Sequence, residues 1–279
     1  LTLAASYQTT MFTRIELENF YGIELDDFAH EVAILSLWLA QHQMNMKFKE
    51  VFGIGNPTLP LKEGGNITLG NATRIDWEKV CLKKENDEIY VLGNPPYLGQ
   101  KKQNTQQKED LKFLFSSLGS NYKTLDYISC WFYKASKFII SNSKFAFVST
   151  NSICQGNHVP LLWPHLLDDN ESEIFFAVKD FKWENSAKNK AGVTCSIVGV
   201  SKKNNTQKKI YSDGTISLVK NITPYLSSSN NIIVNKRVEN LSNLPKMVSG
   251  NMELADGHLM LTDEEKNDII NKYNAAKTY

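Results

Sequence analysis

A four-residue segment of the sequence, Asn94-Pro95-Pro96-Tyr97, places an amide and an aromatic ring on either side of two prolines. The prolines fix φ and remove backbone donors, so the turn is rigid and its carbonyl groups face outward as acceptors. The amide oxygen of Asn94 and the carbonyl of Pro95 can accept both hydrogens of a planar amine, which directs the nitrogen lone pair towards a methyl donor, while Tyr97 stacks on the ring. The segment predicts chemistry on an amino group of a planar molecule; an ordinary Asn-Pro turn that leaves a strand is the alternative.

Two further polar residues follow short apolar runs. Glu24 follows Phe20-Tyr21-Gly22-Ile23, and Asn71 follows Ile67-Thr68-Leu69-Gly70. In an open α/β sheet, ligands bind beyond the carboxyl ends of the strands. Glu24 is therefore placed to hold ribose hydroxyls, although a carboxylate favoured by the dipole of the next helix is the alternative. The amide of Asn71 can bond an adenine edge, and a plain turn residue is its alternative.

Strand-like and helical patterns alternate around these residues. The expected strands are 20–24, 67–71, 89–93, 145–148, 174–178 and 194–200. The first expected helix is capped by Asp26 or Asp27 and runs to about Met44, and the second covers 124–141. Their apolar residues recur at helical spacing: Phe28, Val32, Leu35 and Leu39 in the first, and Leu125, Ile128, Phe132, Ala135 and Ile139 in the second. This alternation predicts an α/β fold with an open, mostly parallel sheet that has helices on both faces, and the last two strands suit a terminal hairpin.

A change of composition after the last expected strand predicts a domain boundary. Residues 201–209, SKKNNTQKK, are polar, basic and without periodicity. We therefore expect a first domain over residues 1–204 and the beginning of a second over 205–279. Within the second, Thr262 and Glu265 form a capping-box pattern that opens a C-terminal helix.

The charge balance gives no global sign of a nucleic-acid partner, because 31 Lys and Arg face 30 Asp and Glu. Local contacts remain: Lys101, Lys102 and Lys108 follow the Pro-Pro turn and can reach phosphates, with solvated loop charges as the alternative. The four cysteines lie far apart without histidines at metal spacing, which predicts neither a metal site nor a disulfide framework. Since no apolar run approaches the roughly 18 residues of a membrane span and no secretion signal is recognisable, we expect a cytoplasmic protein without a membrane partner.

The tetrapeptide resembles the catalytic motif of class I amino-methyltransferases, and the wider sequence resembles the MmeI-like and Eco57I-like restriction-modification polypeptides. The resemblance covers nearly all of the chain. The stretches that carry it are 20–24, 38–45, 70–77, 148–153, 181–183, 245–251 and 261–265.

This resemblance implies a Rossmann-like methyltransferase that moves a methyl group from S-adenosylmethionine to adenine N6 in double-stranded DNA, with the target base flipped out of the duplex. It implies that Glu24 holds the cofactor ribose, that Asn71 lies beside the cofactor adenine, and that residues 94–97 grip the target base. Phe181 or Trp183 would stack on the other face of that base, although either can be a core residue. The segment after 209 would begin a C-terminal target-recognition domain.

The chain departs from the family pattern at its start. The glycine-rich loop that wraps the methionine part of the cofactor precedes the strand of Glu24 in the family, and residues 1–13 contain no glycine. The resemblance therefore implies that this strand lies upstream and that the chain holds the target half of the site with only part of the cofactor half. Two other function classes remain: an amino-methyltransferase acting on protein glutamine or RNA guanine, and a DNA-binding portion that is inactive alone.

Overall fold

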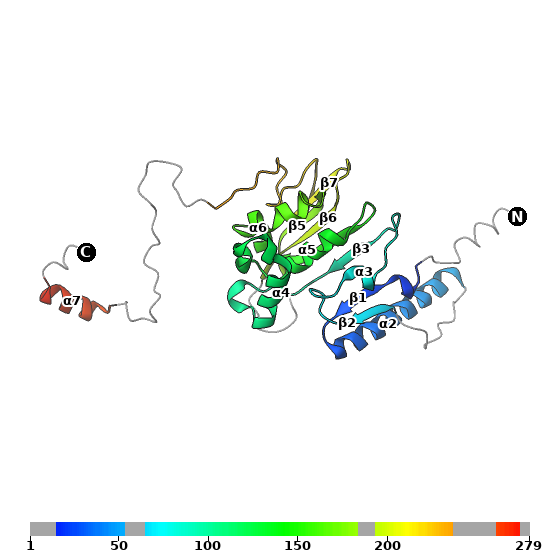
Figure 1. Ribbon diagram of the computed structural model, residues 1–279, viewed down its shortest axis with the longest axis horizontal. Helices are drawn as coiled ribbons and strands as arrows, with labels where there is room; N and C mark the ends of the chain where they lie inside the picture. Colours follow the sequence, from blue (N-terminus) through cyan, green and yellow to red (C-terminus); the bar gives the residue numbers. More distant parts are fainter. Residues whose placement is uncertain (1–14, 54–64, 184–192, 237–260, 274–279) are drawn as a thin grey trace. The chain divides into compact units, whose positions relative to one another are not determined.

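The computed structural model describes residues 15–53, 65–183, 193–236 and 261–273 (Figure 1). The chain divides into two units, 1–235 and 236–279. The first unit contains a parallel two-stranded sheet, β1 (Tyr21–Glu24) and β2 (Asn66–Leu69). It also contains a six-stranded sheet in the order β3-β4-β6-β5-β7-β8. The strands of this sheet are β3 (Tyr90–Gly93), β4 (Lys144–Thr150), β5 (Ser172–Trp183), β6 (Val193–Lys202), β7 (Lys208–Ser212) and β8 (Thr215–Val219).

Strand directions in the larger sheet follow from its pairings. β3 pairs parallel with β4, and β5 pairs parallel with β7, whereas β6 is antiparallel to both β4 and β5 and β8 is antiparallel to β7. Thus β3, β4, β5 and β7 run in one direction, and β6 and β8 run in the other. The expected α/β fold with a mostly parallel sheet is confirmed, as is the hairpin formed by β5 and β6. Because β3 and β4 are parallel, the turn after β3 leaves the sheet at the edge where β4 also ends.

The first long helix, α2 (Asp27–Phe52), begins at the predicted cap. The Asp26 carboxylate accepts the Ala29 N–H at 2.8 Å and satisfies one of the free amides of the first turn. The helix continues well beyond the predicted end near Met44 and ends at Gly53, whose φ of 74° lies in the left-handed region that glycine tolerates. No proline or glycine interrupts residues 45–52, so no residue stops the helix earlier.

The apolar stripe of α2 is exposed. Its residues keep between 42% and 76% of their surface accessible: Phe28, Val32, Leu35 and Leu39. Periodicity therefore predicted the helix correctly, but no described residue buries its apolar face.

The core of the first unit lies where α5 (Ser129–Phe138) packs on β4 and on α6 (His158–Leu167). The Phe132 ring of α5 meets Phe147 of β4 and Trp163 of α6 edge to face, at centroid distances of 5.4 and 6.0 Å. Phe145 and Phe147 alternate with half-buried residues along β4, and Trp163 is fully buried with its indole N–H bonded to the Ile153 carbonyl at 2.8 Å. Burial of each such side chain stabilises the fold by about 1.5–3 kcal/mol, so this packing holds β4 and the neighbouring helices in fixed positions.

The second predicted helix is shorter in the structure than in the sequence analysis. Residues 120–124 form a 3₁₀ turn, η4 (Ser120–Thr124), and α5 begins only at Ser129 because Leu125 is extended and the Asp126 carboxylate bonds the Ile128 N–H at 3.2 Å. The predicted apolar face is nevertheless correct. Its five members are at most 2% exposed: Leu125, Ile128, Phe132, Ala135 and Ile139.

The polar stretch after the Pro-Pro turn contains a helix that the sequence analysis did not predict, α4 (Thr105–Phe115). Its N-terminus is closed by a capping box in which Asn104 and Gln107 exchange hydrogen bonds at 2.9 and 3.0 Å. The remaining short elements of the unit are η1 (Leu17–Asn19), α3 (Trp77–Val80), η2 (Gln100–Lys102), η3 (Ser116–Leu118) and η5 (Asn151–Cys154).

Strands β7 and β8 follow the predicted boundary at residue 204 and extend the same sheet as β5. The functional limits of the two domains, 1–204 and 205–279, stay predictions. In the second unit, α7 (Asp263–Lys272) begins with the predicted capping box. There the Thr262 hydroxyl accepts the Glu265 N–H at 3.2 Å and the Glu265 carboxylate accepts the Thr262 N–H at 2.8 Å.

Within the described residues, no helix is long and apolar enough to cross a membrane.

Candidate active site

The turn that follows β3 presents an amide without a partner. Pro95 is buried, whereas Asn94 and Pro96 are exposed. The two prolines fix the backbone of this segment, as the sequence predicted. The side chain of Asn94 forms no hydrogen bond with any described residue, so its amide oxygen remains available to an external donor.

The ring of Tyr97 is held against β6. Tyr97 is half-buried, and its hydroxyl lies close to the thiol of Cys195, a buried residue of β6. Burial, together with the Cys195 interaction, raises the pKa of Tyr97. Burial likewise raises the pKa of the Cys195 thiol. The phenol is therefore neutral near pH 7, and its ring is fixed at one end.

Leu98, the residue after Tyr97, is hydrogen-bonded through both its backbone N–H and its carbonyl. The Leu98 N–H donates to the Asp126 carboxylate at 2.8 Å, and the Leu98 carbonyl accepts the Tyr127 N–H at 3.0 Å. The same carbonyl accepts the Gln103 amide at 2.8 Å. Sequence analysis singled out none of these three partners, because no local pattern ties them to a turn that precedes them. These three residues fix the backbone at Leu98, where the chain leaves the turn, while Pro95 and Pro96 fix the backbone within the turn.

Glu24 ends β1 with one carboxylate oxygen unoccupied. Its Oε1 accepts the backbone N–H groups of Leu25 at 2.8 Å and Asp26 at 3.3 Å, while Oε2 has no hydrogen-bond partner among the described residues. Glu24 pairs with Leu69 in the parallel ladder, so it lies at the same edge of the sheet as the loop that carries Asn71. The structure therefore brings the two predicted cofactor residues to neighbouring strand ends.

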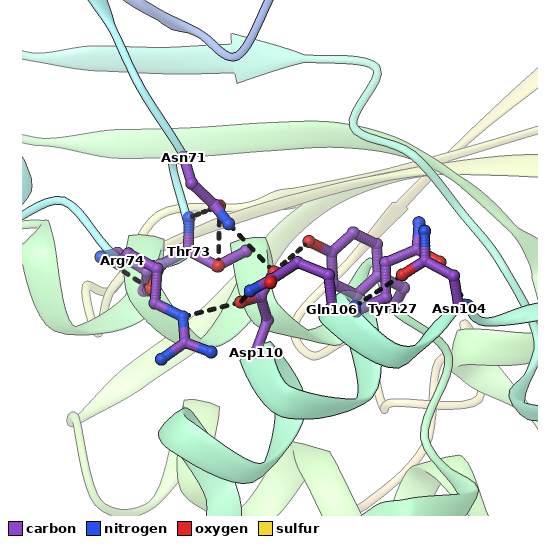
Figure 2. Close-up of polar contacts among 9 residues, drawn as sticks. Asn71, Thr73, Arg74, Asn104, Gln106, Asp110 and Tyr127 are labelled. Carbon is purple, nitrogen blue, oxygen red and sulfur yellow. Dashed lines mark hydrogen bonds and ion pairs between the residues drawn. The ribbon is translucent and has the colours of Figure 1, made fainter.

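The loop after β2 depends on a glycine. Gly70 has a φ of 154°, and a side chain at this position would collide with that of Ile75. Asn71 follows with its amide fully oriented, as Figure 2 shows: Oδ1 accepts the Thr73 N–H at 2.9 Å and the Thr73 hydroxyl at 2.8 Å. On its other side, Nδ2 donates to the Asp110 carboxylate at 3.0 Å.

Asp110 of α4 is the centre of this polar cluster (Figure 2). Its fully buried carboxylate accepts four hydrogen bonds, two at each oxygen. The donors are Asn71 at 3.0 Å and Tyr127 at 2.7 Å to Oδ2, and Arg74 at 2.6 Å and Gln106 at 3.2 Å to Oδ1. Burial opposes ionisation of Asp110, but these four donors outweigh it and lower its pKa. The sequence could not reveal this residue, since it stands in a polar stretch without a motif.

A half-buried lysine attaches the same loop to the core. Lys134 of α5 donates to the carbonyls of Thr73, at 3.4 Å, and Ile75. Burial lowers the pKa of Lys134. Together with Asp110, Lys134 attaches the loop after β2 to α4 and α5, and the residues that bind Leu98 directly precede these two helices.

A β-bulge in β5 sets the orientation of Phe181. Val178 pairs with Ile197 and Phe181 pairs with Cys195, so two residues of β5 oppose one of β6. Within the bulge, Asp180 adopts a φ of 28°, rare for a residue with a side chain, and accepts the Asn151 amide at 3.3 Å.

The two predicted stacking residues lie along one strand end. Residues directly opposite in an antiparallel pair project to the same face, so Phe181 shares the face of Cys195, whose thiol contacts Tyr97. Trp183 pairs with Val193 further along the strand, and its side chain lies outside the described part of the structure.

The predicted phosphate-contacting lysines are exposed beside the turn. Lys101 and Lys102 lie in η2, and Lys108 lies on α4. None of the three takes part in an ion pair with a described residue. Lys108 also lines a hollow of about 340 Å³ that Lys112 and Lys123 border. These charges are free to meet an anionic partner.

The side chains at the ends of β1 and β2 fit the adenosine part of S-adenosylmethionine. Glu24 offers a carboxylate oxygen for ribose hydroxyls, and Asn71 offers an amide for an adenine edge. The described residues contain no glycine-rich loop that would wrap the methionine part. The same part of the chain contains no cluster of potential metal ligands, and the four cysteines are free thiols.

Comparisons with known proteins extend these observations. A sequence profile of the MmeI DNA-methyltransferase domain matches residues 2–212, and one of the MmeI target recognition domain matches residues 228–279. DNA methyltransferase A of Bacillus subtilis (strain 168) is 48% identical over 268 residues, which cover 95% of this chain and 30% of that protein. The structure of the Type IIL restriction-modification enzyme MmeI in complex with DNA matches with a TM-score of 0.82 at 39% identity, over 97% of this chain and 37% of that one. The chain thus spans about a third of the length of each relative.

Proposed function

This chain belongs to the MmeI DNA-methyltransferase family, and on that premise we propose that it transfers a methyl group from S-adenosylmethionine to adenine N6 in duplex DNA. The observation that carries the proposal is the turn after β3: the Asn94 amide has no hydrogen-bond partner among the described residues, the Tyr97 phenol is half-buried and neutral, and Leu98 is hydrogen-bonded to Asp126. This geometry suits a planar amine, and the family supplies the substrate class.

The turn activates the amine through hydrogen bonding. The Asn94 side-chain oxygen and the Pro95 carbonyl each accept one hydrogen of the exocyclic amine, which withdraws the nitrogen lone pair from the ring. Tyr97 stacks on the base and keeps the amine in register with these two acceptors. Preorganised acceptors of this kind act without reorganisation during the reaction, so no separate general base is required to activate the amine. The proton that N6 loses after it is methylated passes to water.

The cofactor supplies an electrophilic methyl group on a sulfonium centre. Glu24 holds the ribose through its free Oε2, and Asn71 holds the adenine, in the proposed arrangement. Both residues lie at the carboxyl ends of the two-stranded sheet formed by β1 and β2, and ligands of open α/β folds bind at such strand ends.

The target adenine must leave the duplex to reach this turn. Of the two stacking candidates we propose Phe181 in preference to Trp183, because Phe181 is directly opposite Cys195, the residue that contacts Tyr97. Three exposed lysines of η2 and α4, which form no ion pair with a described residue, would contact the phosphates of double-stranded DNA: Lys101, Lys102 and Lys108.

The match of residues 228–279 to a target recognition domain supports a site-specific enzyme of a restriction-modification system. The limits 1–204 and 205–279 for its two domains remain part of the proposal. A protein glutamine or an RNA guanine also presents a planar amine to such a turn. The recognition-domain match and the unpaired lysines favour DNA over both. The inactive alternative, a DNA-binding portion alone, is separated by the assay below.

The experiment uses the protein at its full natural length with labelled S-adenosylmethionine and three substrates: duplex DNA, release factor and ribosomal RNA. We expect label in DNA adenine, and we expect Asn94→Ala to lower the turnover about 10²–10³-fold, the usual cost of losing a preorganised polar group. Asn142→Ala is the matched control, because Asn142 is exposed at the opposite edge of the sheet, before β4. Label in cytosine, protein or RNA, or none in any substrate, would refute the proposal.

A further inference from the structure

We propose that Asp110 is a positioning residue: it makes Asn71 a hydrogen-bond donor to a ring nitrogen of the cofactor adenine and, through Tyr127, couples that contact to the catalytic turn. This inference rests on the proposed function and assigns to Asp110 and Tyr127 a role in it. The cluster of Figure 2 carries the argument.

The Asn71 amide has one orientation that its surroundings accept. A carboxylate is an acceptor only, so the atom 3.0 Å from Asp110 must be the NH₂ nitrogen. The Thr73 backbone N–H is a donor only, so the atom 2.9 Å from it must be the oxygen. Turning the amide over would set oxygen against carboxylate and NH₂ against N–H, which makes both contacts repulsive.

In that orientation Asn71 offers a donor and no acceptor. Its oxygen has two lone pairs, and the N–H and hydroxyl of Thr73 occupy both. Its nitrogen has two hydrogens, and Asp110 takes one. The second hydrogen has no partner among the described residues. An adenine edge is therefore read at a ring nitrogen, which accepts, and not at the exocyclic amine, which donates.

Asp110 keeps this arrangement because it remains an anion. Its four donors come from three segments of the chain: the loop after β2, α4 itself, and the residues before α5. Removing the charge would leave donors facing donors in a buried site, which is costly. The carboxylate thus fixes the side chain of Asn71 as well as the path of its loop.

Tyr127 extends the coupling to the chemistry. Its hydroxyl donates to Asp110 at 2.7 Å, and its backbone N–H donates to the Leu98 carbonyl at 3.0 Å. The preceding residue, Asp126, holds the Leu98 N–H. One dipeptide therefore contacts both the cofactor-side cluster and the residue that ends the Asn94–Tyr97 turn, so a displacement of either affects the other.

The first test measures binding. Calorimetry measures the dissociation constant of S-adenosylhomocysteine and of three analogues, in each of which N1, N3 or N7 of the adenine is replaced by C–H. For each nitrogen, the ratio of the analogue's dissociation constant to that of S-adenosylhomocysteine reports the contribution of that nitrogen. In the full-length protein we expect one analogue to bind about tenfold more weakly, the value of one hydrogen bond. Asn71→Ala and Asp110→Asn should bring that ratio to about one. Unfolding or loosening weakens all analogues alike and leaves the ratio unchanged, so the ratio isolates the amide donor.

The second test measures turnover in Tyr127→Phe, which keeps the ring and removes its donor to Asp110. We expect kcat to fall about fivefold to tenfold, roughly one hydrogen bond, while the ratio for adenine analogues is retained. Tyr133→Phe is the matched control: Tyr133 is a buried tyrosine of α5 that stacks on Phe115 and makes no hydrogen bond with Asp110, so its kcat should match the wild type.

Each outcome decides the question. Equal affinity for all analogues in the wild type, or an unchanged ratio in Asp110→Asn, overturns the donor role. A kcat in Tyr127→Phe equal to that of Tyr133→Phe overturns the coupling. A protein that shows the expected ratio but methylates no DNA leaves the donor role standing and refutes the proposed function alone. A protein that binds no S-adenosylhomocysteine refutes both.

Discussion

Replacing Asp126 with alanine should loosen the Asn94–Tyr97 turn and destabilise the fold by about 3 kcal/mol. The buried carboxylate accepts two backbone N–H groups, from Leu98 at 2.8 Å and Ile128 at 3.2 Å. Each hydrogen bond to a charged group contributes about 1.5–3 kcal/mol, so at the lower value Asp126→Ala costs about 3 kcal/mol. For a unit of this size that lowers Tm by about 6–12 °C.

Asp126→Asn is the matched comparison, because an amide oxygen can still accept both N–H groups without the charge. Neutral hydrogen bonds contribute about 1 kcal/mol each, so this variant should lose about 1 kcal/mol and about 2–4 °C. Turnover should differ more strongly between the two variants, with Asp126→Ala the slower, because a displacement of about 1 Å at Leu98 can lower the rate about 10²-fold. Thermal unfolding followed by circular dichroism and a single-turnover methylation assay measure both effects. If Asp126→Ala unfolds within about 2 °C of the wild type and keeps its rate, the turn is not held as described.

Four other predictions concern separate parts of the site. Burial lowers the pKa of His158, whose Nε2 accepts the Asp126 N–H at 3.0 Å. As the pH falls, His158 is therefore protonated in the unfolded chain before it is protonated in the folded protein. The free energy of unfolding should be at its full value at about pH 7.5 and should decline as the pH falls below about 6.5. His158→Gln should flatten that decline in Tm. Gly70→Ala, which forces a side chain into a strained position, should weaken S-adenosylhomocysteine binding about tenfold or more in calorimetry, the cost of about 1–3 kcal/mol of backbone strain. Phe181→Ala should weaken binding of the flipped base by about 1–3 kcal/mol, seen as a smaller fluorescence change of 2-aminopurine at the target position, whereas an equal or larger loss in Trp183→Ala would reverse our assignment. Alanine substitution at Lys101, Lys102 and Lys108 should reduce the slope of log K for DNA binding against log salt concentration by about 0.9 for each phosphate that is no longer neutralised. An unchanged slope would place these lysines outside the interface.

Elements with strong local patterns were predictable from the sequence. The strands that end at Glu24 and Gly93 are short apolar runs bounded by polar residues, and both are present. The cap at Asp26 and the capping box at Thr262 are also local, because donor and acceptor lie within three residues. Helix ends were less predictable: α5 starts late because the Asp126 side chain captures an amide that the helix would otherwise use.

The positioning residues were not predictable because their roles arise from distant contacts. Asp110 meets Asn71 across 39 residues and Lys134 meets Ile75 across 59, and neither pair leaves a periodic signal. The bulge at Asp180 is hidden for a different reason, since no rule of composition places a non-glycine residue at positive φ. The sequence thus predicted groups that would contact ligands, and the structure added the residues that hold those groups in place.

The long sequence separations within the Asp110 cluster have a consequence for the order of folding. Its bonds to Asn71 and Arg74 close loops of 39 and 36 residues, and the entropy of such closure exceeds what one polar bond returns. The apolar contacts among α5, α6 and β4 are more numerous and bury more surface, so we expect them to form first and the cluster to be completed afterwards. A refolding chain should regain the shielded fluorescence of Trp163 before it regains affinity for adenosine ligands, so that a compact but ligand-blind species precedes the native protein.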